Sequence, residues 1–498
     1  MKRTLACLAL LAQSMSAPAP ALALGVSHVF LVQNSGWMEP FYTDPQSRYK
    51  PLITELVMAV AQPGDPMVLA AFNQALPGAP SPKALLSFKF DAKSSRKQVG
   101  GALAALEVAR KPGSLAYADT DLNEAVGTAI RSALGGKSGL VWLVTNNRNS
   151  PNNDLQTARR NREFYELIHS GSAITRALAF PLQMPVQGAH YHANGLMIYV
   201  FAVGDEGARQ LKTLVASGAI AKVITEPAAR LKPLDQDLVR LVPRKVSDAP
   251  GVAFSMTPTG MLRADVNAQA RSPAASIEWH LENTIYPYTI ASAQISARSK
   301  VGSEERPIRL ASSSVTALAP GKSAPLSSTM ALPVRELPGK WSMAAVGSAG
   351  SAYVMPGQIE LQLTNQRLEL SQAFRQRMAR LFPGDPLPEI FTPPSHIKSS
   401  VAKLPLVVRV HYGVAPLVAL IAGALALLGA LGAAALAFAR SRKALVTVED
   451  ELRTMHARAG STQPIFDKAG NKVAQLKTTL FGHQLLDLRE GAQVRLGR

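Results

Sequence analysis

A continuous apolar run that stops at a small polar loop, in residues 28–39 (HVFLVQNSGWME), places the strongest constraint on the fold. Residues 29–32 are β-branched or large apolar side chains without alternation, which predicts a strand covered on both faces in a largely parallel sheet. The loop at 33–38 would then lie at the carboxyl end of this strand. In open α/β sheets that edge is where ligands bind.

Similar strand-like runs recur along the next part of the chain, and segments with helical spacing of apolar residues lie between most of them. The runs are 67–72, 84–90, 140–146, 177–182 and 195–204, and the helical segments are centred on 51–60, 99–106, 122–130, 155–169 and 208–215. Strands that alternate with helices predict a doubly wound α/β sheet. We therefore expect one α/β domain over residues 24–219.

The polar loop after the first strand, QNSGWM, resembles the start of a von Willebrand factor A (VWA) domain, whose metal-ion-dependent adhesion site opens with Asp-x-Ser-x-Ser. In this resemblance Gln33 stands at the first Asp, Ser35 matches the first Ser, and Trp37 replaces the second Ser. Thr120 matches the loop threonine of the family, and Asn146 takes the place of its final Asp. The resemblance implies a VWA-like, integrin I-like domain whose adhesion site keeps two hydroxyls and lacks both carboxylates.

The absence of both carboxylates is expected to weaken metal binding at this site. Mg²⁺ and Ca²⁺ prefer hard oxygen ligands, and carboxylates offset much of the cost of dehydrating the ion. We therefore predict no metal at this site and no cofactor. The alternative is Mg²⁺ held by Ser35 and Thr120, with Glu39, Asp44 or Asp121 as substitute acids.

For several other residues of this region, two structural or functional roles are considered. Thr120 also fits the N-cap of the helix that follows it. Trp37 is either a plug packed over the former metal position, which we favour, or an exposed contact residue. His190 and His192 would face the same way on a strand, but no third ligand is identifiable, so a hairpin-tip role is favoured over a metal role. Ser35 lacks a nucleophile elbow and a linked His and acid, so we predict no enzyme.

The N-terminus predicts export. Residues 1–23 combine Lys2 and Arg3 with an apolar run and a small-residue end, as in a secretory signal peptide cleaved after Ala23. The only cysteine, Cys7, lies in this segment, so the mature chain would have no disulfide and no cysteine chemistry. The net charge of +19 does not predict nucleic-acid binding, because the chain is expected to be exported and has no dense Lys/Arg block. It fits anionic envelope surfaces or a diffusely basic surface.

A second domain follows a connector expected at residues 220–247. Residues 277–281 and 359–363 alternate between apolar and polar side chains, and Gly, Pro and Ser separate several similar segments, KWSMAAV (340–346) among them. About seven such strands predict an all-β immunoglobulin-like sandwich over residues 248–366. Residues 367–413 are expected to form a short amphipathic helix, capped by Ser371 and docked on the sandwich, and then a Pro-rich stalk.

Residues 414–439 are apolar, carry no charge and are long enough to span a membrane as one helix. Arg440, Arg442 and Lys443 follow at once, which places the C-terminal side in the cytoplasm. We expect a single-pass protein of the cell inner membrane, with its N-terminal domains periplasmic or extracellular. Small-residue ridges in the span allow self-association. The cytoplasmic tail, 440–498, is expected to hold a helix at 449–458 and then a small β module.

Taken together, these features predict a membrane-anchored envelope protein that uses a VWA-like domain for protein–protein interaction or scaffolding, without a metal. The protein partner in the envelope is not identified by the sequence. The alternatives are a metal-dependent adhesion receptor and a protein that signals from the envelope to the cytoplasm.

Overall fold

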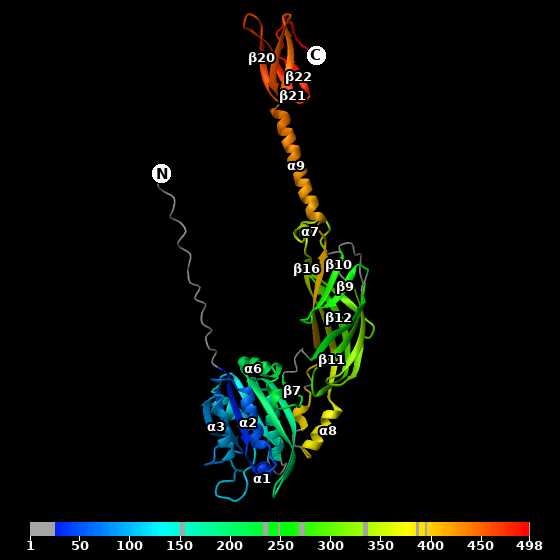
Figure 1. Ribbon diagram of the computed structural model, residues 1–498. Helices are drawn as coiled ribbons and strands as arrows, with labels where there is room; N and C mark the ends of the chain where they lie inside the picture. Colours follow the sequence, from blue (N-terminus) through cyan, green and yellow to red (C-terminus); the bar gives the residue numbers. More distant parts are fainter. Residues whose placement is uncertain are drawn as a thin grey trace, which may run out of the picture.

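The computed structural model describes residues 25–149, 155–232, 238–247, 250–267, 274–331, 337–384, 388–393 and 396–497. An α/β domain, a β-sandwich, a long apolar helix and a small β module follow one another along an elongated molecule (Figure 1). The expected signal peptide, residues 1–23, lies outside the described residues.

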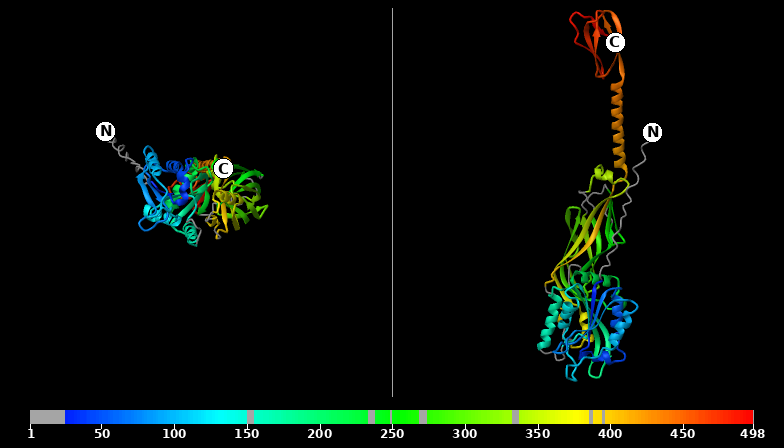
Figure 2. Two further views of the ribbon diagram at one scale, coloured as in Figure 1. Left: turned by 90° about the horizontal axis from the view of Figure 1, so that it is seen from below. Right: turned by 90° about the vertical axis from the view of Figure 1, so that its left-hand side faces the viewer.

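The first domain is a seven-stranded sheet in the order β3-β2-β1-β4-β6-β5-β7, with helices on both faces (Figure 2, right). Its strands are β1 Ser27–Gln33, β2 Pro66–Phe72, β3 Lys83–Lys89, β4 Gly139–Thr145, β5 Ile174–Gln187, β6 His192–Val203 and β7 Ala229–Lys232. Its α-helices are α1 Glu39–Thr43, α2 Tyr49–Val60, α3 Ser95–Ala104, α4 Leu122–Thr128, α5 Leu155–His169 and α6 Gly204–Ala216. Short helical turns lie at η1 Gly36–Met38, η2 Ala129–Ala133 and η3 Ile220–Lys222.

Strand β1 lies in the middle of this sheet and supplies side chains to both faces. Phe30 and Val32 belong to the core that includes α2, α3 and α6, whereas Val29 and Leu31 belong to the core that includes α4 and α5. All four are buried, because successive side chains of a strand point to opposite faces. The expectation of a strand covered on both faces is confirmed.

The second half of the sheet differs from the expected parallel arrangement. Strand β1 pairs in parallel with β2 and β4, but β6 runs antiparallel to β4 and to β5. The cause is the turn at 188–191, which joins β5 directly to β6. Two consecutive strands joined by a tight turn must run antiparallel. The domain is therefore a mixed α/β domain: β1, β2, β4 and β5 run in one direction, and the parallel expectation is wrong for β6 and for the edge strands β3 and β7.

The boundaries of the expected connector also need correction. Within residues 220–247, β7 completes the first sheet, and β8 Val239–Ser247 already pairs with a strand of the second domain. Alternating burial along both strands shows why: Ala229, Leu231, Val239 and Leu241 are inside.

The second domain contains ten strands among the described residues, more than the seven expected. They are β8, β9 Val252–Met256, β10 Leu262–Asn267, β11 Ala274–Asn283, β12 Tyr288–Val301, β13 Glu304–Leu310, β14 Ser314–Leu318, β15 Ser323–Ala331, β16 Tyr353–Leu370 and β17 Ser400–His411. Strand β13 pairs with both β12 and β15 and so links two sheets that enclose one apolar core.

Two segments of this region were read wrongly from the sequence. The end of the expected stalk is strand β17, which pairs with β16 and β10 and buries every second side chain from Ala402 to Val410. The segment KWSMAAV is not a strand, because its second half is helix α7 Met343–Gly347, capped by the Ser342 side chain.

The amphipathic helix α8 Gln372–Leu381 begins at Ser371, whose side chain accepts a hydrogen bond from the Phe374 N–H, as expected. Its apolar face does not dock on the sandwich. Phe374, Met378 and Leu381 are part of the core of the α/β domain, together with Phe391 of the short turn η5 Pro388–Phe391. Helix α8 therefore joins the sandwich to the first domain.

Helix α9 Ala415–Ala439 is long and apolar enough to cross a membrane, with a mean hydropathy of 2.4, and its apolar side chains are exposed. The tail beyond it consists of β18 Ser441–Val448, β19 Glu451–Arg458, β20 Thr462–Phe466, β21 Lys472–Thr479, β22 Gly482–Leu486 and β23 Val494–Leu496, in two three-stranded sheets. The helix expected at 449–458 is wrong. Glu449 and Asp450 have positive φ values and form a tight turn, which makes β18 and β19 a hairpin.

Candidate functional site

The five residues predicted from the VWA resemblance meet at the carboxyl edge of the first sheet. Gln33 ends β1, Ser35 and Trp37 lie in the loop after it, Thr120 lies in the loop before α4, and Asn146 follows β4. The structure brings Gln33, Ser35 and Thr120 into direct contact. With Thr145 at the end of β4, these three residues form what we call the Gln33 cluster.

The side-chain amide of Gln33 makes four hydrogen bonds. Its Oε1 accepts from the Thr145 hydroxyl at 2.5 Å and from the Asn146 N–H at 3.1 Å. Because a backbone N–H can only donate, this contact fixes which end of the amide faces β4. The Nε2 group then donates to Ser35 Oγ at 2.7 Å and to Thr120 Oγ1 at 3.0 Å.

The Gln33 cluster is closed to solvent, and the Gln33 amide has a full set of hydrogen-bond partners. Gln33, Ser35, Thr120 and Thr145 are each 0% exposed, and the Thr120 hydroxyl donates to Ser35 Oγ at 2.6 Å. An amide has two N–H donors and an oxygen that accepts two bonds, so the side chain of Gln33 has its full set of partners. Buried polar groups with full partners hold a structure in one arrangement.

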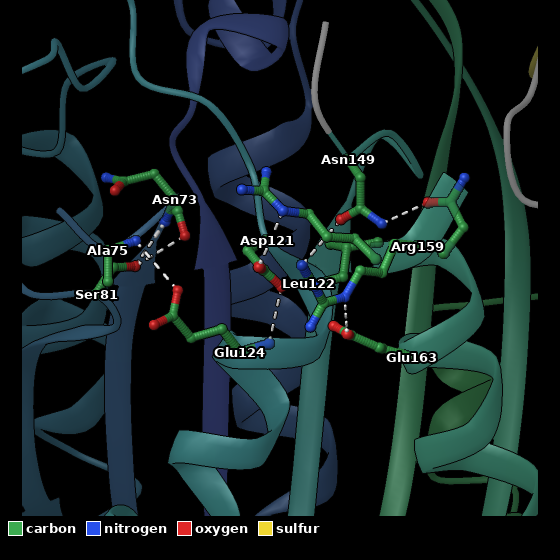
Figure 3. Close-up of polar contacts among 11 residues, drawn as sticks. Asn73, Ala75, Ser81, Asp121, Leu122, Glu124, Asn149, Arg159 and Glu163 are labelled. Carbon is green, nitrogen blue, oxygen red and sulfur yellow. Dashed lines mark hydrogen bonds and ion pairs between the residues drawn. The ribbon is translucent and has the colours of Figure 1, made fainter. Parts of the chain in front are cut away.

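The loop that carries Thr120 is fixed by the N-terminus of α4 (Figure 3). Asp121, not Thr120, is the N-cap: its Oδ1 accepts from the Glu124 N–H at 2.9 Å. Asn149 Oδ1 accepts from the Leu122 N–H at 3.0 Å, and the Glu124 carboxylate accepts from the Ala75 N–H at 3.2 Å. The capping interpretation of Thr120 is therefore wrong, and its hydroxyl is left for the Gln33 cluster.

The acids that could have replaced the missing carboxylates have other partners. Glu39 is buried and accepts from the N–H groups of Ala189, at 2.8 Å, and of Tyr191, at 3.3 Å. Asp44 accepts from the Gln187 N–H at 2.8 Å, and this bond and one from the Gln46 N–H lower the pKa of its carboxyl. Asp121 lies 3.4 Å from Arg160 in addition to its capping bond.

This donor set does not fit Mg²⁺ or Ca²⁺. Between the two hydroxyls that the resemblance assigns to an ion, the structure has the N–H groups of an amide, which repel a cation. Glu39, Asp44 and Asp121 are engaged by backbone N–H groups or by arginine. A divalent ion would need oxygen ligands with negative charge at this position.

Trp37 lies beside the cluster and is partly exposed. Its ring centroid is 4.6 Å from that of Tyr191 and 4.6 Å from the guanidinium carbon of Arg148. The Asn146 side chain turns away from the cluster, and its Nδ2 donates to the Trp37 carbonyl at 3.1 Å. Trp37 is thus neither a buried plug nor a free contact residue, but one wall of a pocket.

The two histidines lie at the β5–β6 turn, as expected for a hairpin tip. His190 and His192 are exposed, and the His190 ring contacts Tyr117 and Tyr191. Among the described residues, no group of three His, Cys, Asp or Glu side chains is placed to hold a metal ion.

Four residues of this edge were not identified from the sequence. Thr145 is the last residue of β4, and its hydroxyl could have been recognised from its place beside Asn146. Tyr42 and Tyr49 both donate from their hydroxyls to the Gln33 carbonyl, at 2.9 and 2.8 Å. Arg148 stacks on Trp37, and no local pattern in the sequence indicates this contact.

Comparisons with known proteins add little to this geometry. No protein-family model matches the chain, and no curated protein sequence matches it significantly. Among solved structures, the crystal structure of CfaE, the adhesive subunit of CFA/I fimbria of enterotoxigenic Escherichia coli, aligns over 47% of this chain and 72% of that chain, at 8% identity and a TM-score of 0.15. Similarity at this level carries no argument about fold or function.

Proposed function

We propose that this protein is a membrane-anchored protein of the cell envelope whose first domain, of VWA-like type, binds another protein at the carboxyl edge of its sheet without a metal ion. The anchor is α9, and the first domain lies at the opposite end of the elongated molecule (Figure 1). An exported domain held away from its membrane by a sandwich is suited to contact a partner, and no catalytic arrangement is found at its edge in the described residues.

The proposal that binding needs no metal ion is supported by the position of the Gln33 amide. It joins the ends of β1 and β4 to the Thr120 loop through uncharged hydrogen bonds. In the VWA resemblance a metal ion would join the same segments. The amide thus holds the binding edge together by itself, and partner binding should need no divalent ion.

The experiment is crosslinking of the full-length chain in intact envelopes, followed by identification of the crosslinked protein with and without excess EDTA. We expect the same partner to be captured in both. Trp37→Ala should reduce capture, because the partly exposed ring of this tryptophan forms a wall of the pocket at this edge. Val215→Ala, which shortens an exposed apolar side chain on α6 of the same domain, is the matched control and should leave capture unchanged.

Loss of capture in EDTA with recovery in Mg²⁺ would contradict the proposal and favour a metal-dependent adhesion receptor. Equal capture by the wild-type chain and the Trp37→Ala variant would show that the partner binds elsewhere on the molecule.

A further inference from the structure

A pocket of about 180 Å³ opens beside the Gln33 cluster, and we call it the rim pocket. It lies between the loop after β1, the loop after β4, the start of β6 and the C-terminal end of α8. Its lining residues are Trp37, Asn146, Arg148, residues 190–195 and residues 381–383.

The rim pocket has a basic lining. Arg148, His190 and His192 contribute cationic or protonatable groups, and no lining residue is acidic. Among the described residues, no carboxylate lies within ion-pair distance of Arg148: its guanidinium stacks on Trp37 and donates one bond, to the Pro383 carbonyl at 3.0 Å. A guanidinium has five N–H donors, so most of those of Arg148 have no acceptor in the part of the chain that the structure describes.

The walls of the rim pocket are fixed before any ligand arrives. The Asn194 side chain donates to the Arg380 carbonyl at 3.2 Å, and Arg377 of α8 donates to the Pro181 carbonyl at 2.9 Å. At Gly195 a Cβ would lie 2.8 Å from the Cβ of Leu381, so α8 packs directly on the β6 backbone. A preformed site of this kind loses little freedom on binding.

A second donor near Arg148 also lacks an acceptor. The Nε1–H of Trp37 is buried and has no hydrogen-bond partner among the described residues. An unpaired buried N–H carries a desolvation cost, and this one belongs to the ring on which Arg148 stacks. A planar carboxylate suits the fork of an arginine, and it can accept from two donors at once.

The position of the rim pocket indicates which kind of molecule would supply a carboxylate to it. The elements that line the pocket belong to the first domain and α8, at the end of the molecule that is distant from α9 (Figure 1). The lipid headgroups of the membrane that holds α9 therefore do not face it. The partly exposed rings of Trp37 and Tyr191 offer apolar surface for the residues on either side of an acidic side chain.

We propose that the rim pocket binds an acidic side chain of a partner protein, with Arg148 as the main contact. This inference rests on the proposed function and names the chemistry that the first domain recognises. The probe is a fluorescein-labelled peptide of glutamates, with a glutamine peptide of equal length as control, titrated against the full-length chain in detergent micelles.

We expect the glutamate peptide alone to bind, more weakly as salt increases. Arg148→Ala should weaken binding at least about tenfold, and Arg148→Lys less, since lysine keeps the charge without the planar fork. Arg96→Ala, at an exposed position on α3, should have no effect. Melting temperatures of all variants check that they remain folded.

Two outcomes would overturn the rim-pocket inference: equal binding of the glutamate peptide by the Arg148→Ala variant, and a preference for inorganic phosphate or phosphatidylglycerol vesicles over the peptide. If Arg148→Ala still captures the envelope partner in EDTA, only this inference fails. If the wild-type chain captures no partner in EDTA, the proposed function itself fails.

A second surface, at the end of the sandwich next to α9, supports a separate inference. Helix α7 lies against α9, and the Tyr412 hydroxyl, just before α9, donates to the Pro338 carbonyl and ties the α7 loop to the same point. On this loop Trp341 is 67% exposed and Met343 is 75% exposed. Trp341 and Met343 lie side by side on one loop, and a contiguous exposed apolar patch is typical of a membrane or protein contact.

We infer that Trp341 and Met343 lie in the lipid interface of the membrane that α9 spans. Tryptophan is enriched at that depth, where its ring is in the acyl boundary and its N–H near the headgroups. Lys340, whose Nζ lies 5.5 Å from the Trp341 ring centroid, could reach anionic headgroups from the same turn. These contacts would fix the angle of the sandwich on the membrane surface.

The four tryptophans of the chain make a direct test possible. Trp142 and Trp279 are buried in the two domains, and Trp37 lies at the rim pocket, so only Trp341 is adjacent to α9. In liposomes that contain brominated lipid, we expect quenching of the intrinsic fluorescence of the full-length chain, and Trp341→Phe should remove most of it. Trp279→Phe is the matched control. Quenching that persists in Trp341→Phe, or no quenching of the wild-type chain, would overturn this inference.

Discussion

Gln33 shows how a single amide side chain can join three segments at one edge of a sheet. Its amide connects two strand ends and one loop through four hydrogen bonds within a fully buried site. The VWA resemblance placed Gln33, Ser35 and Thr120 in one site, and the structure brings them into contact. It did not predict that the amide itself would bridge the hydroxyls, since this depends on the Thr145 hydroxyl and the Asn146 N–H, which fix the orientation of the amide.

At the opposite edge of the same strand, His28 is a buried titratable residue. Its Nδ1 accepts from the Trp142 indole N–H at 3.3 Å. Its Nε2 lies 3.8 Å from Asp65 and has no hydrogen-bond partner within the described ranges. That separation is an ion pair only if the imidazole is protonated. Burial lowers the pKa of His28 from 6.5 to about 4, so the ring is neutral at neutral pH.

The first prediction concerns the pH dependence of stability. Because the folded-state pKa of His28 lies below its unfolded value, the unfolded chain takes up the proton first as pH falls. The contribution of neutral His28 to the free energy of unfolding is fully present above about pH 6.5 and is lost progressively between pH 6.5 and 4. At about pH 5 the free energy of unfolding should be lower by about 2 kcal/mol. His28→Gln, which keeps an acceptor and does not titrate, should show a smaller fall in melting temperature over this range. An equal fall in both proteins would mean that His28 is protonated in the fold and pairs with Asp65.

The β5–β6 hairpin forms one wall of the rim pocket. Its turn is held by Glu39, whose carboxylate accepts from successive N–H groups of residues 189–191. A Cβ at Gly188 would overlap this carboxylate. The sequence placed the two histidines at this tip but not the direction of β6, because strand direction is set by the turn and not by the apolar pattern.

The second prediction is that Gly188→Ala destabilises the first domain by about 1–3 kcal/mol, since the methyl group forces the carboxylate away from its donors. Urea denaturation of the full-length chain in detergent, followed by tryptophan fluorescence, measures the change. Gly101→Ala is the matched control: this exposed helical glycine of α3 has open space around it, and alanine should stabilise by about 0.5–1 kcal/mol. Similar effects of both substitutions would contradict the role of the Glu39 contact.

Helix α8 was predicted with its cap and its apolar face, but not with its docking site. Local sequence gives the 3.6-residue spacing of Phe374, Met378 and Leu381. Which surface that face meets depends on the path of β16 and β17, which return the chain from α8 to the sandwich. That information is tertiary and leaves no local pattern.

The third prediction is that Phe374→Ala releases α8 from the first domain, at a cost of about 3–5 kcal/mol for a buried phenylalanine. Limited proteolysis should then cleave between β16 and β17 faster than in the wild-type chain. Gln376→Ala, on the exposed face of α8, is the control and should leave the rate unchanged. Equal rates for Phe374→Ala and the wild-type chain would show that the helix does not depend on this contact.

At the scale of the whole molecule, the fourth prediction concerns membrane topology. The described parts of the α/β domain and the sandwich lie at one end of α9 and the described tail lies at the other. The basic residues directly after α9 favour a cytoplasmic tail. Protease added to spheroplasts should digest the α/β domain and the sandwich and leave the tail module intact. Protection of the α/β domain under these conditions would reverse the proposed orientation.

The account as a whole depends on a binding edge that is complete without a divalent ion. Calorimetric titration of Mg²⁺ and of Ca²⁺ into the full-length chain in detergent tests this most directly, with melting temperatures measured in the same buffers. We predict no heat beyond dilution and no rise in melting temperature, because the Gln33 amide already pairs with Ser35 and Thr120. Saturable heat together with stabilisation, both abolished by Ser35→Ala, would contradict the account.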